Sequence, residues 1–394
     1  MSDSWKSTLS ALDRYEIIEK IQQSSNLPAA DAIALEQTAF ASSSTFAEYE
    51  AACSSVPSQT QQGDSNEDTP EEAQDEGARI GSYKNCHPVA SGLTSTVFRS
   101  GTTALKVIIP TSQPIEPHNP FREVRILEQL RERPHIITLL SAFRDQEQRL
   151  VLAFPYMPCT LADLAPEDVD TRRIARDVLS GLAYIHAQGI IHRDVKPSAV
   201  LLPSATGPAY ISDFGTAWHP VFSPASEPPD AKILDIGTGP YRAPEVLFGD
   251  HSYTGAIDAW AAGVMLAEML GHPLFESRPA HEDGSQLGLI LSIFKTLGTP
   301  TRETWPEAEG FKVTPFELWT VFPGNSWEEL LPGVEEGWRE LVGALVRFDG
   351  SRATGEQVSF IFRFDIFYTI FICSLTSFRL SASKYSKTEG VEKI

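Results

Sequence analysis

A short polar loop carries side chains suited to chemistry on a hydroxyl group and a phosphate. Asp194 and Lys196 lie two residues apart in the stretch IIHRDVKPSAVLL, residues 190–202, with apolar runs on both sides. Because these runs are expected to be buried, they should hold the loop in a fixed position. A fixed carboxylate can accept a proton from a hydroxyl group, and a nearby ammonium can balance phosphate charge.

A second carboxylate follows and suits a divalent cation. Asp213 lies 19 residues after Asp194, at the end of the apolar stretch AYIS and before Phe-Gly. Magnesium binds one or two carboxylates together with phosphate oxygens. A carboxylate at the end of a strand, before a flexible glycine, is therefore a candidate metal ligand.

A lysine in an apolar strand completes the set of charged candidates. Lys106 lies in the stretch TTALKVI, where a charged side chain is rare. A buried lysine needs an anionic partner, and Glu123 in the amphipathic stretch NPFREVRILEQL is available. A strand lysine more often points to solvent, and each short motif alone is common by chance. The interpretation therefore depends on their combination.

The segments around these residues predict an α+β fold. Short β-like runs occur at residues 97–98, 104–109 and 150–154. A helix-rich stretch follows from Leu161 onward. This order predicts a small β-rich lobe with its connection at residues 80–157, a larger helical lobe at residues 158–357, and a cleft between them.

The composition argues against several classes of protein. The 394 residues carry 32 Lys+Arg and 52 Asp+Glu, a net charge of −20. Because nucleic acids and anionic membranes attract basic surfaces, we expect neither as a partner. The four scattered cysteines contain no CxxC pair, which argues against a disulfide framework or zinc module and favours the reducing nucleus or cytoplasm. Residues 1–20 show no pattern of a signal peptide.

Both ends of the chain differ from its centre. Residues 1–79 hold 4 basic and 15 acidic side chains. Helical spacing of apolar residues within 10–23 and 28–52, followed by a polar stretch at 54–76, predicts a partly helical and then disordered extension. This N-terminal extension is either a passive linker or an acidic regulatory segment. A further alternative is that the extension is the functional module of the protein.

In the C-terminal tail the longest uncharged run, residues 366–378, is shorter than the ~20 residues of a membrane helix.

Taken together, the charged residues resemble the motif series of eukaryotic protein kinases. The series is Lys106, Glu123, Asp194, Asp213 and Ala243-Pro244-Glu245, with spacings of 17, 71, 19 and, from Asp213 to Glu245, 32 residues. The resemblance covers about residues 83–355. It implies the two-lobed kinase fold and transfer of the ATP γ-phosphate to serine or threonine of a protein substrate, with Mg²⁺ as the metal.

The resemblance implies a role for each charged residue. Lys106, oriented by Glu123, would neutralise the α- and β-phosphates, and Asp213 would hold the metal. Asp194 would accept the hydrogen bond of the substrate hydroxyl, and Lys196 would steady the γ-phosphate. The resemblance also implies three residues that support the site without taking part in the chemistry. These are Asp258, which braces the catalytic loop, and the ion pair of Arg352 with Glu245.

The resemblance also implies the nucleotide contacts. The set is Ala90, Gly92, Val97, Ala104, Lys106, Phe154, Pro155, Met157 and Asp213. Main-chain groups of Pro155 and Met157 would face the adenine, Ala104 would lie over its ring, and Phe154 would gate the back pocket. The loop that would cover the phosphates, residues 90–97, retains only Gly92 of the three glycines usual in the family.

One further departure from the family pattern raises an alternative function. Ala199 stands where the family has the asparagine that binds a second Mg²⁺. Losing one metal ligand costs on the order of 1–3 kcal/mol of transition-state stabilisation. The alternative is therefore a pseudokinase that keeps the fold and acts as a scaffold or allosteric partner. The retained charged residues favour an active kinase.

Two segments indicate a branch of the family. Tyr241-Arg242 before Ala243, and the stretch ILSIFKTLGTPTRETWP at residues 290–306, resemble the CMGC group and its cyclin-dependent kinases. The chain looks like the single-chain fungal kinases that activate cyclin-dependent kinases, which makes those kinases candidate substrates. Because EPHNPFRE, residues 116–123, lacks the PSTAIRE sequence that contacts cyclin, a cyclin partner is doubtful.

The activation segment, residues 213–245, lacks the usual phosphorylation site. Thr238 matches the threonine that, in the family, contacts the catalytic loop, here the polar loop of residues 192–196. Ile233 occupies the place of the activating phosphothreonine. A fixed carboxylate can partly replace phosphate as a partner of arginine. We therefore hypothesise that Asp230 or Asp235 pairs with Arg193 and that the segment needs no phosphorylation.

The C-terminal tail, residues 358–394, lacks the final helix of the family. After Gln357 the sequence reads VSFIFRFDIFYTIFICSLTSFRL. We expect either an exposed apolar segment, which predicts poor solubility, or translated intron sequence in the gene model.

Overall fold

The computed structural model describes residues 77–92, 94–110, 116–276, 285–316, 320–350 and 352–353, and short stretches between residues 17 and 54. The chain divides into two compact units, Met1–Gln74 and Asp75–Ile394, and each is described by itself. The predictions for residues 55–76 and for the C-terminal tail lie outside the described residues.

In the first unit, the helix predicted over residues 28–52 is interrupted. Helix α3 spans Phe46–Ser54, and residues 39–40 are helical, but residue 43 is not. Thr45 Oγ1 accepts a hydrogen bond from the backbone of the new helix, at 3.3 Å, as a capping residue does. Residue 43 therefore lies between two helical stretches, and Thr45 is placed to cap the second.

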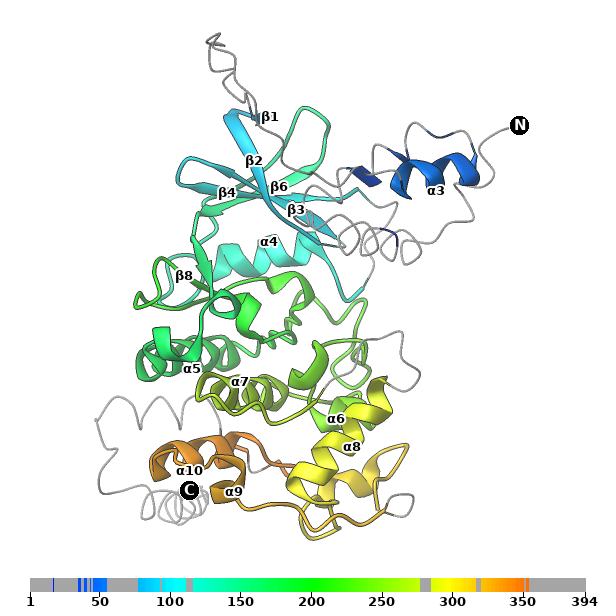
Figure 1. Ribbon diagram of the computed structural model, residues 1–394, viewed down its shortest axis with the longest axis vertical. Helices are drawn as coiled ribbons and strands as arrows, with labels where there is room; N and C mark the ends of the chain where they lie inside the picture. Colours follow the sequence, from blue (N-terminus) through cyan, green and yellow to red (C-terminus); the bar gives the residue numbers. More distant parts are fainter. Residues whose placement is uncertain are drawn as a thin grey trace, which may run out of the picture. The chain divides into compact units, whose positions relative to one another are not determined.

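The second unit begins with a six-stranded antiparallel sheet (Figure 1). Its strands are β1 (Ala78–Ile80), β2 (Tyr83–Ser91), β3 (Ser95–Ser100), β4 (Thr103–Ile108), β5 (Ser141–Arg144) and β6 (Leu150–Pro155). Their spatial order is β1-β2-β3-β4-β6-β5, so β4 lies between β3 and β6. The three predicted β runs are confirmed as β3, β4 and β6.

Alternation along β4 separates the core of the sheet from its other face. Leu105 and Val107 are buried in an apolar cluster with Val151 and Ala153 of β6. Because successive strand residues point to opposite faces, Lys106 lies on the face away from this cluster. Helix α4 (Pro120–Gln129) lies below the sheet in Figure 1.

Helix α4 begins where its sequence signals place it. The Asn119 side chain accepts from the Arg122 backbone N–H at 3.0 Å, and Pro120 occupies the first helical position. Its buried residues include an apolar pair, Ile126 and Leu127, and two charged residues, Arg122 and Glu123. Burial of two charged residues on one short helix requires partners from elsewhere in the chain.

The second lobe is mainly helical. Its helices are α5 (Thr171–Ala187), α6 (Pro244–Leu247), α7 (Ala256–Met269), α8 (Ser285–Leu297), α9 (Trp327–Leu330) and α10 (Glu336–Leu345). A small sheet joins β7 (Cys159–Thr160), β8 (Val200–Leu202) and β9 (Tyr210–Ile211). Short 3₁₀ helices include η1 (Leu161–Asp163), η2 (Pro166–Asp168), η3 (Pro197–Ala199), η4 (Phe214–Thr216), η5 (Gly239–Tyr241) and η6 (Pro306–Gly310).

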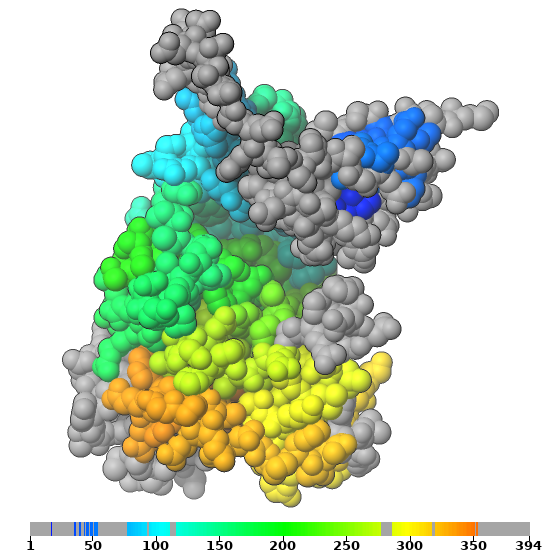
Figure 2. Space-filling model, in the orientation of Figure 1, coloured from blue at the N-terminus to red at the C-terminus, as the bar shows by residue number. Residues whose placement is uncertain are grey.

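Helix α7 forms the centre of this lobe. Nearly all of its residues are buried, and Trp260 is fully enclosed and stacks on Phe275. Figure 2 shows that the visible surface of the second unit follows the sequence, from the cyan atoms of the sheet to the orange atoms of α9 and α10. The predicted α+β fold with a β-rich lobe followed by a helical lobe is confirmed. In the described part of the chain, no helix has both the length and the apolar character needed to cross a bilayer.

Candidate active site

The strand register brings the predicted nucleotide-contacting residues of the sheet to one face. Ala90 pairs with Val97, Val97 pairs with Lys106, and Ala104 pairs with Phe154. Directly opposite residues of antiparallel strands have side chains on the same face, and Ala104 lies two residues from Lys106. The five side chains therefore lie on a single face, the face away from the buried cluster of the sheet.

The connection after β6 presents main-chain groups away from the sheet. Tyr156 N donates to Thr102 O at 2.8 Å. In a trans peptide the Pro155 carbonyl points opposite to the Tyr156 N–H, so this carbonyl points away from β4. Pro155 is one of the two residues whose main-chain groups the resemblance implies face adenine.

The loop between β2 and β3 is a tight hairpin despite its missing glycines. Gly92 N donates to Ser95 O at 2.9 Å. A Cβ atom placed on Gly92 would meet only ordinary contacts, with Ser95 O at 3.7 Å. Gly92 has no positive φ angle, and the hairpin therefore does not require a glycine at residue 92.

Lys106 joins α4 to the segment that follows β9. Its Nζ lies 2.7 Å from Glu123 Oε1 and 2.8 Å from Asp213 Oδ1. Glu123 is almost completely buried, with 3% of its side chain exposed, whereas the Asp213 side chain is 53% exposed. The three residues that the sequence predicts as a functional group are therefore in contact, and Asp213 is the member open to a ligand.

The electrostatics of this cluster keep its outer members ionised. The Lys106 ammonium holds the pKa of Asp213 far below its usual value. Burial acts to lower the pKa of Lys106, but the carboxylates of Asp213 and Glu123 outweigh it and raise that pKa. Burial raises the pKa of Glu123. Near neutral pH a cation and an exposed carboxylate therefore stand side by side, suited to phosphate and metal respectively.

Asp213, which contacts Lys106, has an unusual backbone conformation. Asp213 has φ of 61°, in the left-handed region that is costly for residues other than glycine. The following Phe214 is fully buried, with its ring edge-on to His192 at 4.9 Å. At Gly215 a Cβ atom would lie 3.4–3.8 Å from the polar atoms of the cluster. A buried anchor on one side therefore holds the strained aspartate in place.

Asp258 of α7 holds the catalytic loop in place. Asp258 Oδ2 and Oδ1 accept from the backbone N–H groups of His192 and Arg193, each at 2.8 Å. The His192 ring contacts Ser212 O at 2.8 Å, which ties the loop to the residue before Asp213. The predicted bracing contact of Asp258 is present, and the two carboxylate-bearing segments are linked through His192.

Asp194, Lys196 and Thr238 form a compact polar group. Lys196 Nζ donates to Asp194 Oδ2 at 2.7 Å and to Thr238 Oγ1 at 2.9 Å, and Thr238 Oγ1 donates to Asp194 Oδ1 at 2.6 Å. The side chains of Asp194 and Lys196 are 15% and 22% exposed. An accessible carboxylate beside an ammonium can hold a hydroxyl group and an anion together.

Ala199 contributes only its backbone to the site. The residue is buried, and its carbonyl accepts from Ser212 N at 2.8 Å and from Ser212 Oγ at 2.9 Å. Its methyl group has no oxygen to bind a cation. Among the candidates considered, Asp213 alone offers an exposed carboxylate in the place expected for Mg²⁺. The residues present therefore fit one cation shared with phosphate oxygens and lack the side-chain ligand of a second.

The partner of Arg193 is not the one that the sequence hypothesis named. Arg193 Nη1 donates to Glu227 Oε1, and both side chains are fully buried. Asp230 is exposed, and Asp235 is 91% exposed with Arg242 at 3.8 Å. The hypothesis that Asp230 or Asp235 pairs with Arg193 is therefore wrong. No spacing rule in this proline-rich stretch distinguishes the three acidic residues, because the fold of the loop decides which of them turns inward.

The scaffold ion pair of the helical lobe is present as expected. Arg352 donates to both oxygens of Glu245, at 2.7 and 3.2 Å, and to Arg347 O and Ala256 O. This bidentate pair joins Glu245 of α6 to the end of the described chain. It anchors the activation segment at its C-terminal end.

Comparison with known proteins identifies similar chains. A family model described as the protein kinase domain matches residues 89–358. The serine/threonine-protein kinase csk1 of Schizosaccharomyces pombe is 37% identical over 239 residues, which are 59% of this chain and 76% of that protein. The serine/threonine-protein kinase CAK1 of Saccharomyces cerevisiae is 31% identical over 278 residues, 57% of this chain and 75% of that protein. Cyclin-dependent kinase F-3 of Oryza sativa subsp. japonica is 32% identical over 289 residues, 70% of this chain and 63% of that protein.

Proposed function

This chain belongs to the protein kinase family and is a cyclin-dependent-kinase-like serine/threonine kinase, and we propose that it phosphorylates the activation segments of other cyclin-dependent kinases. Two fungal kinases, csk1 and CAK1, are among its similar proteins. The resemblance of its motifs to the single-chain fungal kinases that activate cyclin-dependent kinases supports the same substrate class.

The observation that carries the proposed chemistry is the contact of Lys106 with both Glu123 and Asp213, at 2.7 and 2.8 Å. We assign Lys106 to the α- and β-phosphates of ATP, because its raised pKa keeps it cationic. Glu123 fixes the direction of the ammonium. Because phosphoryl transfer depends mainly on alignment and charge neutralisation, a cation held at a fixed position needs little reorganisation when the nucleotide binds.

Asp213 is the residue assigned to the metal. When bound, Mg²⁺ would neutralise the β- and γ-phosphate oxygens. The Asp213 carboxylate remains ionised because Lys106 lowers its pKa. With its side chain 53% exposed, the carboxylate is also accessible. Ala199 leaves a second metal without a side-chain ligand, so the proposed reaction depends on Asp213 alone.

Asp194 is assigned to the hydroxyl group of the protein substrate. Its Oδ1 accepts a hydrogen bond from Thr238 Oγ1 at 2.6 Å, which shows that a hydroxyl group can reach this oxygen. The carboxylate would orient the attacking serine or threonine and take its proton late in the reaction. Lys196, 2.7 Å from Asp194, would steady the transferred phosphoryl group.

An assay of phosphate transfer tests this assignment. The full chain is incubated with Mg²⁺ and ATP and with a cyclin-dependent kinase as substrate. The matched control substrate has alanine in place of its activation-segment threonine. We expect phosphate on the intact substrate and none on the control. The variant Asp194→Asn should react about 10²–10⁴-fold more slowly, because it lacks the carboxylate that orients the hydroxyl group.

Ala199 and the loop that retains only Gly92 are the features that favour a pseudokinase. If the wild-type chain binds ATP but transfers no phosphate to cyclin-dependent kinases or to a generic protein substrate, the scaffold function replaces the proposed one. Transfer to the generic substrate alone would contradict only the proposed substrate class. We also propose a nuclear or cytoplasmic location on the basis of the cysteine pattern.

A further inference from the structure

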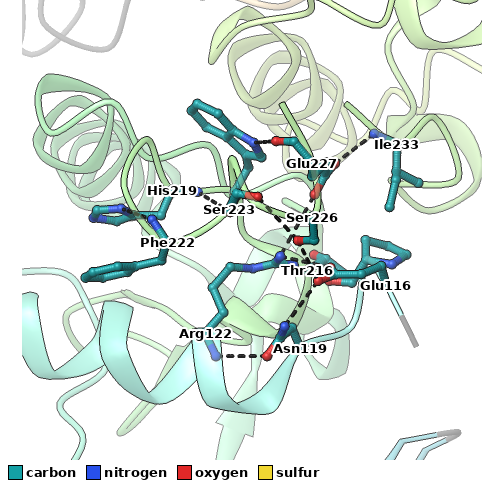
Figure 3. Close-up of polar contacts among 12 residues, drawn as sticks. Glu116, Asn119, Arg122, Thr216, His219, Phe222, Ser223, Ser226, Glu227 and Ile233 are labelled. Carbon is teal, nitrogen blue, oxygen red and sulfur yellow. Dashed lines mark hydrogen bonds and ion pairs between the residues drawn. The ribbon is translucent and has the colours of Figure 1, made fainter. Parts of the chain in front are cut away.

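A buried carboxylate joins three parts of the kinase domain. Glu227 Oε1 accepts from Arg193 Nη1 of the catalytic loop and from the backbone N–H of Ile233, the latter at 2.7 Å. Glu227 Oε2 lies 3.9 Å from Arg122 Nη1 of α4. Figure 3 shows Glu227 between Ile233 and the α4 residues. The catalytic loop, the activation segment and α4 therefore meet at one side chain.

We propose that Glu227 is a positioning residue. Its carboxylate holds α4, the catalytic loop and the activation segment in the arrangement that phosphate transfer requires. The chain then needs neither a phosphate on the activation segment nor a partner subunit on α4 to reach that arrangement. This inference rests on the kinase activity proposed above and adds the residue that organises the site.

Each of the two arginines beside Glu227 has a carboxylate partner. Arg122 Nη1 also lies 2.8 Å from Glu116 Oε2. The two guanidinium groups of Arg122 and Arg193 therefore face two carboxylates, those of Glu116 and Glu227. Buried charges are tolerated only when they are paired. Because each arginine already has a carboxylate partner, a phosphate group is not required to neutralise this cluster.

The backbone of the activation segment holds Glu227 in place. Glu227 N donates to Ser223 O at 2.9 Å, and Glu227 O accepts from Trp218 Nε1 at 2.9 Å. The Lys232 ammonium lies over the Trp218 ring, 5.0 Å from its centroid. The carboxylate thus belongs to a turn that is closed on both sides, so little ordering remains to be done when it meets the arginines.

The same part of the activation segment follows the length of α4. Ser226 Oγ donates to Glu116 Oε1 at 3.1 Å, just before the helix. Within the helix, Arg125 lies over the Phe222 ring at 4.8 Å, and the His219 ring contacts Gln129 Oε1 at 3.0 Å. Residues 122, 125 and 129 are spaced by three and four positions and share one face of a helix. This face is therefore in contact with residues 219–227 of the same chain (Figure 3).

Contact along this face also fixes the nucleotide-binding side of α4. Glu123 follows Arg122 directly, and adjacent helical residues point about 100° apart. Holding Arg122 against Glu227 therefore fixes the rotation of α4 that places Glu123 on Lys106. A shift of α4 would break both ion pairs at once.

The test replaces the carboxylate by an amide of the same shape. Glu227→Gln should lower kcat by about 10- to 100-fold while the KM for ATP changes by less than about threefold, because the variant misplaces the catalytic groups more than it weakens nucleotide binding. Amide hydrogen exchange in α4 and in residues 228–236 should become faster. Glu227→Asp, which keeps the charge, should recover part of the lost kcat. A Glu227→Gln enzyme with the kcat of the wild type would overturn the proposal.

The matched control is Asp230→Asn, which removes an exposed carboxylate three residues away and should leave kcat unchanged. Phosphatase treatment of the wild-type protein should also leave its activity unchanged, and loss of activity would overturn the proposal. If Glu227→Gln does not fold, Trp218→Phe replaces it, because it removes only the N–H that holds Glu227 O. That variant should lower kcat by about 3- to 10-fold, and a wild-type kcat would again overturn the proposal.

An inactive wild-type chain has a different meaning. It would contradict the proposed function and not the role of Glu227 specifically. The exchange rates of α4 in Glu227→Gln and wild type then still test the positioning role, since equal rates would overturn it.

Discussion

Two charged clusters lie on different sides of α4 and differ in exposure. Lys106, Glu123 and Asp213 form the first, and the Asp213 side chain is 53% exposed. Arg122, Arg193 and Glu227 form the second, in which Arg193 and Glu227 are 0% exposed. Both connect α4 to the activation segment by ion pairs. The exposed cluster can exchange its contacts for those of a ligand, whereas the buried cluster can only hold structure in place.

One short helix, α4, contributes to both the candidate active site and the buried ion pairs. Arg122 and Glu123 are neighbours in sequence, and each supplies one cluster. A change at Asp213, the exposed member of the first cluster, should therefore affect catalysis with little effect on folding. Changes in the buried cluster should affect both, because they leave a buried charge without its partner.

The largest effect is expected at the exposed cluster, from Asp213→Asn. The amide cannot supply the negative charge that the metal requires, so kcat should fall by at least about 10³-fold. The melting temperature should stay close to that of the wild type, because this side chain is half exposed. Phosphate transfer and thermal unfolding are measured on the same preparation. A large fall in melting temperature would show that this cluster also supports the fold, and the distinction between the clusters would fail.

A smaller loss is expected from Glu123→Gln. Lys106 loses one carboxylate but keeps Asp213 at 2.8 Å, so kcat/KM should fall by about 10- to 100-fold. Steady-state kinetics at varied ATP concentration measure the change. Glu128→Gln is the matched control, because Glu128 is an exposed residue of the same helix. Equal activities of the two variants would contradict the positioning of Lys106 by Glu123.

The elements that carry the exposed cluster could be predicted from local patterns, and the resemblance to protein kinases implied that their charged residues come together. The β-like run around Lys106 and the amphipathic stretch around Glu123 are confirmed as β4 and α4. Alternation along β4 places the lysine away from the apolar core, and the apolar residues next to Asp213 predict a strand end. The resemblance also implied the nucleotide contacts, and the register of β2, β3, β4 and β6 places those predicted residues of the sheet on one face.

The buried cluster could be predicted only in part. The sequence suggested that a carboxylate meets Arg193, but it did not identify Glu227. The stretch around Glu227 has no helical or strand periodicity, and its path depends on turns such as that between Ser223 and Glu227. The contacts of Trp218 and Ile233 with Glu227 span only nine and six residues, but they depend on the path of this irregular loop. Sequence patterns describe faces of regular elements and carry little information about irregular loops.

A gain of activity is expected from Ala199→Asn. The new amide oxygen would supply the side-chain ligand that a second cation lacks, so kcat should rise by up to about 10-fold and the reaction should saturate at lower Mg²⁺ concentration. Initial rates over a series of Mg²⁺ concentrations measure this effect. Ala199→Ser, which has a shorter side chain, is the control and should behave like the wild type. An unchanged Mg²⁺ dependence in Ala199→Asn would mean that a side-chain ligand at residue 199 does not recruit a second cation.

The smallest effect concerns the contact of α4 with the activation segment at His219. Its Nδ1 accepts from the backbone N–H groups of Val221 and Phe222 at 3.0 and 3.3 Å, which requires an unprotonated nitrogen. Burial lowers the pKa of His219 from 6.5, so the unfolded chain binds a proton more readily than the folded chain. The contribution of His219 to stability is therefore complete above pH 6.5 and is lost as the pH falls toward the lower folded-state pKa.

Thermal unfolding at pH 7.5 and pH 5.5 should show this contribution, with His219→Gln as the comparison variant. Because one hydrogen-bonded contact is worth about 1 kcal/mol, the fall in melting temperature between the two pH values should be about 2 °C larger in the wild type than in the variant. The Lys106–Asp213 pair does not contribute to this difference, since the shifts in its pKa values keep both groups ionised across this range. An identical pH response in both proteins would show that His219 does not hold the activation segment against α4, and contact along that face would then depend on Glu227 and Phe222.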